Sequence, residues 1–443
     1  MTEGERYLPG RQDRAQYMRL DVARVLKRFH FCERPLIIAQ AGWLSSIAPI
    51  DIKIALPRHF WQDALTADAL RTRVFELRYP SRMLEVGEDE PVVSVFEDAI
   101  DAPSALAFVR ALEAVYKPAL LHAYQTYLAM ADDIADGPSV RFLRMAVQDK
   151  QEQIRELGEF VQMIAATASD EEKQTAQAWV DALRESLERI GGLGIATPTA
   201  GGERKTASLR KPFHFAEVPA RDPRFHQVRF YWPNVVDADF PYGDGLRLQL
   251  RSAVSHLNEV WAIETGGAIL HAFAGDLDWE FILDAARWTY DEARHTKMGL
   301  DRLTGWGYRP DELPLGTYIF DSARGEPPVT RLGMLHYFET KNIGKKNDRA
   351  EAFASYNDDV SRHDMEFDWA DETIHAHYGA KWLRALHQKY PSLPDRDSIH
   401  ERCDALVNAL VETATDDERR EIRQIAEAMI QKAERLAQPA TGS

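Results

Sequence analysis

The chain has 443 residues, of which 45% are hydrophobic, and it carries a formal net charge of −16 at pH 7. A chain of this kind can bury a large core, and we expect either two domains or one large domain. The negative charge argues against nucleic acid and anionic membranes as partners. No apolar run approaches the roughly 20 residues of a membrane span, and the first residues lack an apolar signal region, so a cytoplasmic location is expected.

Four helices are predicted before residue 170. Apolar periodicity places them at residues 12–46, 52–77, 104–132 and 138–168. Pro57 marks an early break or a helix start within the second of them. Cys32 and Cys403 are too few and too far apart to indicate a disulfide framework or a zinc site.

The middle of the chain is predicted to be a linker. An amphipathic helix at 170–190 is followed by Gly/Pro-rich residues 191–225, and residues 226–233 alternate enough for a short strand or an extended arm. The expected domains are an N-terminal helical bundle (1–190), a linker and arm (191–245), a second bundle (246–390) and a C-terminal helical extension (391–443).

The second half repeats the helical layout. Helices are predicted at 246–273, 277–304, 330–343 and 350–389, and residues 398–436 are expected to add one or two outer helices. Residues 438–443 are expected to fray.

Two Asp-Glu-x-x-His motifs dominate this half: Asp291-Glu292 with His295, and Asp371-Glu372 with His375. A glutamate and a histidine three residues apart lie on one helix face, where both can bind one metal ion. A further glutamate lies 33 residues before each motif glutamate, about the length of a helix, a turn and the return on an antiparallel neighbour. The predicted ligands are therefore Glu259, Glu292, His295, Glu339, Glu372 and His375.

Glu264 is the competing candidate on the first ligand helix. It lies 28 residues before Glu292, which breaks the equal spacing, and five residues would shift it by about 7 Å along the axis. We expect Glu259 to be the ligand and Glu264 to be a packing or hydrogen-bonding residue.

On these motifs, residues 246–390 resemble the ferritin-like di-iron carboxylate proteins. The Asp-Glu-x-x-His version is similar to that of bacterial multicomponent monooxygenases and ribonucleotide reductase small subunits. The resemblance covers about a third of the chain. It implies an all-α fold of four-helix bundles and two iron ions, either of which manganese could replace. It also implies that Asp291 and Asp371 each hydrogen-bond a histidine of the other helix.

The same resemblance implies dioxygen and a small organic molecule as substrates, which makes the chain a di-iron oxidase or oxygenase. The resemblance also allows an electron-donor protein as a partner and a homodimer as the assembly. Gly299 stands where reductase subunits carry their radical tyrosine, which weighs against a reductase. The alternatives are a ferroxidase or metal-storage protein, and a structural bundle without metal.

An offset near 226 residues relates the two halves, since Glu33 falls opposite Glu259 and Glu113 opposite Glu339. We infer a tandem duplication with a degenerate N-terminal copy, although coincident helix lengths would give a similar offset. The first copy has Thr66 and Glu152 in place of the histidines, and a structural role is expected for it. Its carboxylates are Glu33, Asp63, Glu113, Asp149 and Glu152, and the expected partners are Arg34, Arg71, Arg144 and Arg155.

Other residues near the motifs allow two interpretations. Gly266 and Gly267 either open a pocket beside the metals or permit close helix packing. Trp288 and Tyr290 are adjacent to the ligands, but aromatic residues there usually only pack, so no role is assigned to them.

Overall fold

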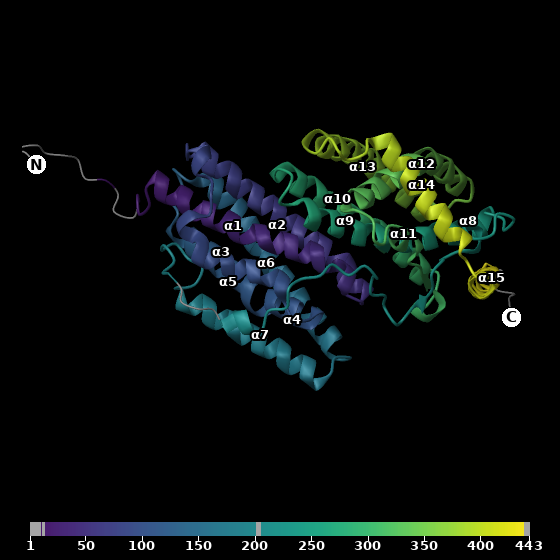
Figure 1. The fold of residues 1–443 in the computed structure, drawn as a ribbon, viewed down its shortest axis with the longest axis horizontal. Helices are drawn as coiled ribbons and strands as arrows, with labels where there is room; N and C mark the ends of the chain where they lie inside the picture. The colour runs from purple at the N-terminus through teal and green to yellow at the C-terminus, as the bar shows by residue number, and fades with distance from the viewer. Residues whose placement is uncertain (1–9, 11–13, 201–204, 438–443) are drawn as a thin grey trace, which may run out of the picture. The chain divides into compact units, whose positions relative to one another are not determined.

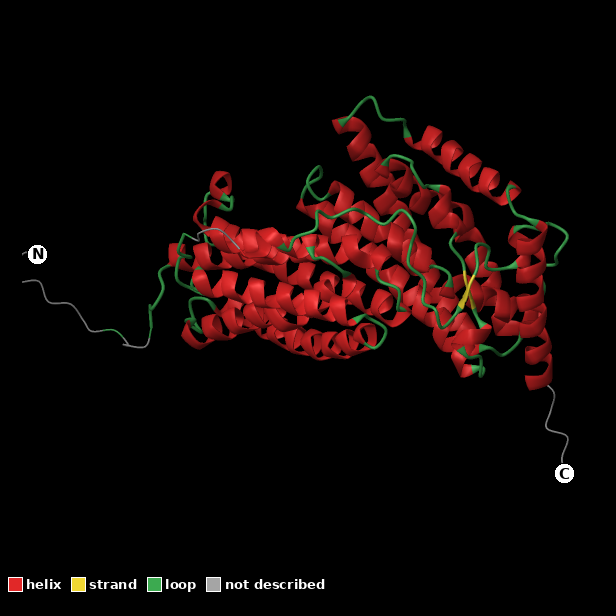
Figure 2. Ribbon diagram, turned by 60° about the horizontal axis from the view of Figure 1, so that its bottom comes forward, coloured by secondary structure: helices red, strands yellow, loops and turns green. Residues whose placement is uncertain are grey.

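The computed structural model describes residue 10 and residues 14–200 and 205–437. Regular structure in these residues is almost wholly helical (Figures 1 and 2). Strands β1 (His226–Gln227) and β2 (Pro314–Leu315) form one short parallel pair. The predicted all-α class is therefore confirmed, whereas the predicted arm at 226–233 contains only two residues of strand. The predicted fraying of 438–443 lies outside the described residues.

The chain divides into two compact units. Unit 1 comprises Met1–Ile37 and Gln62–Phe213, and unit 2 comprises Ile38–Trp61 and His214–Ser443. These bounds differ from the predicted domains, because residues 38–61 belong with the second half of the chain. No helix in the described part of the chain has the length and apolarity that crossing a membrane requires.

The described residues of unit 1 form α-helices joined in part by short 3₁₀ turns and by one π-helical turn. A π-helical turn, Leu112–Tyr116, joins α4 to α5 and changes which residues face inward. The helices are α1 (Arg19–Trp43), α2 (Ile50–Glu76), α3 (Glu90–Glu97), α4 (Ala105–Ala111), α5 (Lys117–Met130), α6 (Gly137–Ala165) and α7 (Asp170–Arg189). The ends of α1 and α2 that lie between residues 38 and 61 belong to unit 2.

Helix α2 passes through Pro57, so the predicted break or start at this residue is wrong. The helix begins seven residues earlier, where the Asp222 carboxylate accepts a hydrogen bond from the Ile50 amide at 3.0 Å. This long-range cap satisfies one of the free amides of the first turn.

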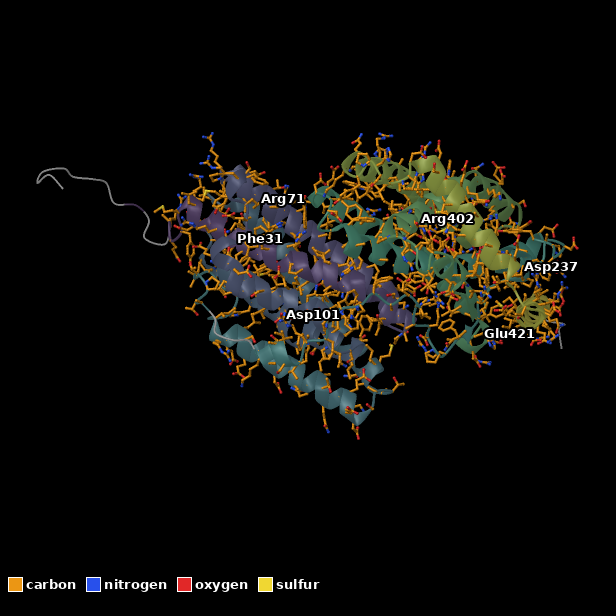
Figure 3. All side chains as sticks on the ribbon, viewed as in Figure 1. Phe31, Arg71, Asp101, Asp237, Arg402 and Glu421 are labelled. Atoms are coloured by element: carbon orange, nitrogen blue, oxygen red, sulfur yellow. The ribbon has the colours of Figure 1, made fainter. Side chains whose placement is uncertain are left out.

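Unit 2 holds the second set of helices. They are α8 (Gly245–Leu257), α9 (Val260–Phe273), α10 (Trp279–Gly305), α11 (Tyr318–Ser322), α12 (Pro328–Ser355), α13 (Asp359–Lys389), α14 (Arg396–Glu412) and α15 (Asp416–Leu436). Helix α10 packs against α8, α9 and α13, and α12 packs against α9, α13 and α14. The pairs α9–α10, α10–α13, α13–α12 and α12–α9 thus close a ring. Helices α14 and α15 carry exposed charges such as Arg402 and Glu421 (Figure 3).

Two helix boundaries in unit 2 differ from the prediction. The helix predicted at 246–273 is interrupted at Asn258, between α8 and α9. The break predicted between 343 and 350 lies instead at Tyr356–Asp358, where Asn357 adopts a left-handed φ of 56°. Asparagine tolerates this conformation better than most residues, whereas Gly344 remains inside α12.

Three glycines let the helices approach closely. A Cβ on Gly266 would lie 2.4 Å from the Thr289 hydroxyl, and one on Gly267 would lie 2.4 Å from the Ala41 carbonyl oxygen. A Cβ on Gly299 would lie 2.3 Å from the Leu257 amide nitrogen. Gly266 and Gly267 therefore serve packing, and the interpretation that they open a pocket is wrong.

Candidate metal centre

The six predicted ligands lie together inside unit 2. Together with Asp368, they form three overlapping groups, and the ligand atoms within each group lie within 4.8 Å of one another. The groups are Glu259, Glu292 and His295; Glu292, Glu339 and His375; and His295, Asp368 and Glu372. Each of the four packed helical segments contributes, because Glu259 caps α9 and the others lie on α10, α12 and α13.

Three atoms at the centre of this cluster are buried without a hydrogen-bond partner: His295 Nδ1, His375 Nδ1 and Glu259 Oε2. His295 Nδ1 lies 3.3 Å from Glu259 Oε2, and His375 Nδ1 lies 3.2 Å from Glu292 Oε1. Buried polar atoms are normally satisfied, and unpaired lone pairs converging from several helices are what a cation would satisfy. The donor set therefore fits a metal ion.

The other imidazole nitrogens make the crossed contacts that the sequence predicted. His295 Nε2 lies 3.3 Å from Asp371 Oδ2, and His375 Nε2 lies 3.4 Å from Asp291 Oδ2. An Nε2–H that donates to a carboxylate leaves the Nδ1 lone pair free for a metal.

Two arginines hold these aspartates in place. Arg294 Nη1 lies 2.6 Å from Asp291 Oδ1 and 2.9 Å from Asp371 Oδ2, so it connects α10 with α13. Arg287 Nε donates to Asp291 Oδ2 at 2.7 Å. We call these four residues the Arg–Asp lattice. It balances the two aspartate charges, so neither draws on the charge of a bound cation.

Trp288 also holds two of the carboxylates, although no role was assigned to it from the sequence. Its indole N–H lies 3.1 Å from Glu292 Oε1 and 3.2 Å from Glu339 Oε1. One donor thus brings together glutamates of α10 and α12.

Sequence reasoning missed two residues of the cluster, Asp368 and Lys346. The Lys346 ammonium lies 2.5 Å from Glu372 Oε1 and also pairs with Asp368. Asp368 lies four residues before Glu372 on α13, and Lys346 lies seven residues after Glu339 on α12. Both spacings place the residue on the ligand face of its helix, so the signal was present in the sequence.

The electrostatics of the cluster reflect its density of charge. Burial would lower the pKa of His295 and His375, but the surrounding carboxylates outweigh it and raise both pKa values well above the usual range. Burial and the neighbouring charge of Glu292 raise the pKa of Glu339 to about 7. In the absence of a metal, protons on these groups neutralise part of the buried charge.

Glu264 lies outside the cluster, as expected. It is fully buried and forms ion pairs with Lys53 and Arg221. Its carboxylate is therefore held by two cations away from the ligand groups.

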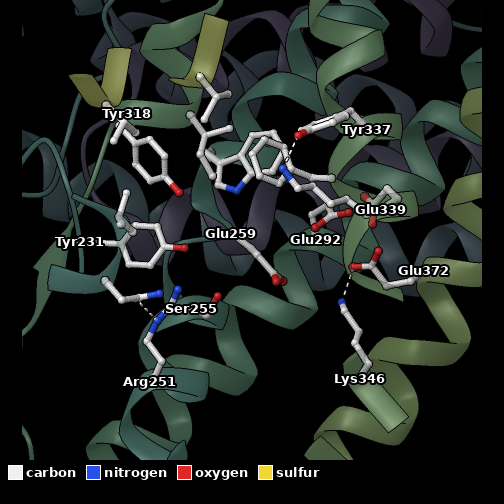
Figure 4. A pocket seen from close by; sticks show the side chains of 18 of the residues that line it. Tyr231, Arg251, Ser255, Glu259, Glu292, Tyr318, Tyr337, Glu339, Lys346 and Glu372 are labelled. Carbon is white, nitrogen blue, oxygen red and sulfur yellow. Dashed lines mark hydrogen bonds and ion pairs between the residues drawn. The ribbon is translucent and has the colours of Figure 1, made fainter. Parts of the chain in front are cut away.

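A cavity of about 320 Å³ opens onto the carboxylates (Figure 4). All four predicted glutamate ligands line it, together with Lys346. Aromatic and basic residues form much of the remaining wall, and they include Tyr231, Trp261, Tyr318, Phe338 and Arg251. The volume is near the lower end for small-molecule pockets.

A family model described as "Protein of unknown function (DUF455)" matches residues 201–431, which is more than half of the chain. The chain belongs to this family. A search of curated proteins and a search of solved structures each found no match. The DUF455 match contains all of the ligand residues named above and the wall of the cavity.

Most of unit 1 lies outside the DUF455 match, and a different cluster occupies its interior. Lys150 pairs with Glu33 at 2.7 Å and also with Asp63, and Lys117 pairs with Asp63. The Tyr124 hydroxyl donates to Glu33 at 2.5 Å. Lysines thus hold the two buried acids, where arginines were expected.

The other N-terminal carboxylates are less buried than Glu33 and Asp63. Glu113 and Asp149 are half-buried, and Glu152 is exposed. Of the expected arginines, Arg155 pairs with Glu159 on the surface. No further group of metal-ligand type was found among the residues described in unit 1.

Proposed function

We propose that unit 2 is a ferritin-like bundle that holds two iron ions, or iron and manganese, and oxidises a small organic molecule with dioxygen. The closed ring of α9, α10, α12 and α13 supports the bundle. Four glutamates and two histidines from these segments are the ligand set of carboxylate-bridged dinuclear centres.

The observation that carries the proposal is the convergence of buried ligand atoms that make no hydrogen bond. His295 Nδ1, His375 Nδ1 and Glu259 Oε2 have no hydrogen-bond partner, while both histidines are turned by aspartates on their far sides. His295 Nδ1 and His375 Nδ1 lie at ion-pair distance from carboxylate oxygens without forming hydrogen bonds, and a metal ion between them would bind both kinds of atom.

Charge balance supports two divalent ions. The cluster contains five carboxylates, those of Glu259, Glu292, Glu339, Asp368 and Glu372. One Lys346 ammonium and two divalent ions supply five positive charges, which equals this number. Uncompensated carboxylates in a buried site would be costly.

The proposed ligands, Trp288 and the cavity would have different roles in the reaction. Iron ions, when bound, supply the electrons that activate dioxygen. The histidines would offer neutral ligands in a fixed tautomer, Trp288 restrains Glu292 and Glu339, and the carboxylates would hold the ions through oxygen atoms. The cavity gives substrate access to the carboxylate side. An electron-donor protein is expected to complete turnover.

We also propose that the chain arose by tandem duplication. In unit 1, α1, α2, α5 and α6 each contribute a residue to one buried cluster, as the ligand segments of unit 2 do. Two lysine ammoniums there take the place that two metal ions would have in unit 2.

Metal content and oxygen reactivity test the proposal. Protein purified from iron- and manganese-supplemented cells should contain about two ions per chain. Adding oxygen to the Fe(II)-loaded protein should produce an absorbance change that candidate substrates accelerate. Iron storage would be indicated instead if no candidate substrate changes the oxidation rate and the protein assembles into cage-sized particles.

A matched pair of variants locates the centre. Glu259→Gln should lose at least one ion and the oxygen reaction, whereas Glu264→Gln should retain both ions. Both residues lie on the same helical segment, and only the first faces the ligand groups. If Glu264→Gln is poorly folded, the metal content per folded chain still shows whether Glu264 is a ligand. Unchanged metal content in Glu259→Gln would contradict the proposal.

A further inference from the structure

Arg251 of α8 is a buried cation in the cavity wall. It is only 7% exposed. Its Nε donates to the Asn234 side-chain oxygen at 2.8 Å, and its guanidinium lies 5.3 Å from the ring centre of Tyr231 and 5.2 Å from that of Tyr242. Its Nη1 is buried without a hydrogen-bond partner. Among the residues that the structure describes, no carboxylate forms an ion pair with it.

The two lysines of the cavity wall, in contrast, are paired with carboxylates. Lys341 pairs with Asp404, and Lys346 pairs with Asp368 and Glu372. Arg349 is only half-buried, and its guanidinium carbon lies 5.4 Å from the ring centre of Tyr242. A buried cation is ordinarily paired, so Arg251 presents a donor for an anion that the described side chains do not supply.

The position of Arg251 relative to the carboxylates sets the length of a ligand. Arg251, Ser255 and Glu259 follow at intervals of four residues, and all three line the cavity (Figure 4). The six residues from Arg251 to the end of α8 rise by about 9 Å, and the turn at Asn258 adds the rest of the distance to Glu259. The wall along this interval includes Tyr231 and Tyr318, whose rings are 5.7 Å apart. A ligand that reaches from Arg251 to Glu259 therefore has an apolar body against aromatic rings.

We infer that the substrate is a small amphiphilic anion whose carboxylate or phosphate group pairs with Arg251 and whose apolar body extends to the glutamates. The inference deepens the proposed oxidase or oxygenase activity and depends on it for the reaction. The anionic group is held at the far end of the cavity, so the carbon presented to the metal centre lies several bonds away from it.

Binding to metal-free protein tests the anion site without relying on turnover. The probes are ω-phenylalkanoates from phenylacetate to 6-phenylhexanoate, their primary amides, and phenylalkyl phosphates of equal length. Calorimetric titration of chelator-treated protein prevents a carboxylate from binding directly to metal. At least one acid or phosphate should bind at least ten-fold more tightly than the matched amide. The two anion series distinguish a carboxylate from a phosphate ligand.

Variants assign the preference to Arg251. Arg251→Gln should abolish the difference between anion and amide, and Arg251→Lys should retain part of it. Arg402→Gln, at an exposed arginine of α14 paired with Glu326, is the matched control and should change nothing. The comparison of acid with amide in the unaltered protein needs no variant, so it stands even if Arg251→Gln fails to fold.

Two results would overturn the inference: no anion in either series binds better than its amide, or the preference persists in Arg251→Gln. Metal content is measured separately in the same preparations. If the protein binds metal and reacts with oxygen but shows no preference for anions, only the inference about Arg251 is rejected. If it prefers anions but binds no metal, only the proposed function is rejected.

Discussion

Asp291 and Asp371 orient the histidines without belonging to the ligand groups. Each accepts from the histidine of the opposite helix and is held by arginine. Asparagine keeps the shape but loses the charge that orients and polarises the imidazole. Asp291→Asn and Asp371→Asn should retain much of the metal and slow reoxidation by about 10- to 100-fold.

Stopped-flow reoxidation of Fe(II)-loaded variants measures this effect. Asp301→Asn is the matched control, because Asp301 is an exposed acid on the same helix that pairs with Lys297. Rates in all three variants equal to that of the unaltered protein would show that the crossed contacts do not tune the histidines.

The raised pKa values at the centre predict how metal affinity depends on pH. His295 and His375 have pKa values raised well above the usual range, and that of Glu339 is raised to about 7. Each group must release its proton to bind a metal, so binding weakens as pH falls. The apparent affinity for Zn²⁺ should fall at least about ten-fold between pH 8 and pH 6.

Calorimetry in two buffers of different ionisation enthalpy measures the protons released per Zn²⁺ ion. No proton release at pH 7 would mean that these groups are already deprotonated in the metal-free protein, or that they do not bind the ion.

The junction of α8 and α9 is the element that places Glu259. Asn258 donates to the Val254 and Pro314 carbonyl oxygens at 2.8 and 3.0 Å and accepts from the Gly316 amide at 2.7 Å. Asn258→Ala leaves buried backbone groups of the β2 segment unsatisfied. It should lower the free energy of unfolding by about 1 to 3 kcal/mol.

Because Glu259 directly follows this residue, the same variant should weaken binding of the ion that Glu259 helps to hold. Denaturant unfolding and metal titration measure the two effects. A loss of stability with metal binding unchanged would show that α9 holds Glu259 in place without the Asn258 contacts.

The helices themselves were largely predictable, whereas their interruptions were not. Periodicity located α10, α13 and their motifs, but the break at Asn258 depends on contacts with Pro314 and Gly316, more than fifty residues away. Ending the third helix at 343 placed Lys346 in a loop, where its pairing with Glu372 could not be foreseen. Local sequence indicates a helix face, and the long-range partners decide where that face ends.

The two units of the whole chain neutralise buried carboxylates by different means. Unit 1 uses the ammonium groups of Lys117 and Lys150, and we propose that unit 2 uses metal. Glu33→Gln should therefore leave the metal content at about two ions per chain, while Glu292→Gln should lower it. Elemental analysis of both variants measures their metal content. A loss of metal in Glu33→Gln would place an ion in unit 1.

The buried ion pairs of Lys150 in unit 1 also predict an effect on the stability of the protein. Lys150 pairs with both Glu33 and Asp63 and is 1% exposed. Lys150→Met would leave buried acids with less compensation, and it should lower the free energy of unfolding by about 3 to 5 kcal/mol. Denaturant unfolding measures it, and Lys173→Met, at an exposed pair on α7, is the control expected to have little effect.

The two sides of the centre are unequal, since the glutamates face the cavity whereas the histidines lie against the Arg–Asp lattice. A metal ion that arrives through the cavity passes the place where we infer that the substrate binds. For a metal ion that enters by this route, we expect metal to bind first and substrate second. A molecule held by Arg251 would then block the path of the metal ion. Chelators should therefore remove the metal more slowly from protein with a molecule bound at Arg251 than from protein with an empty cavity.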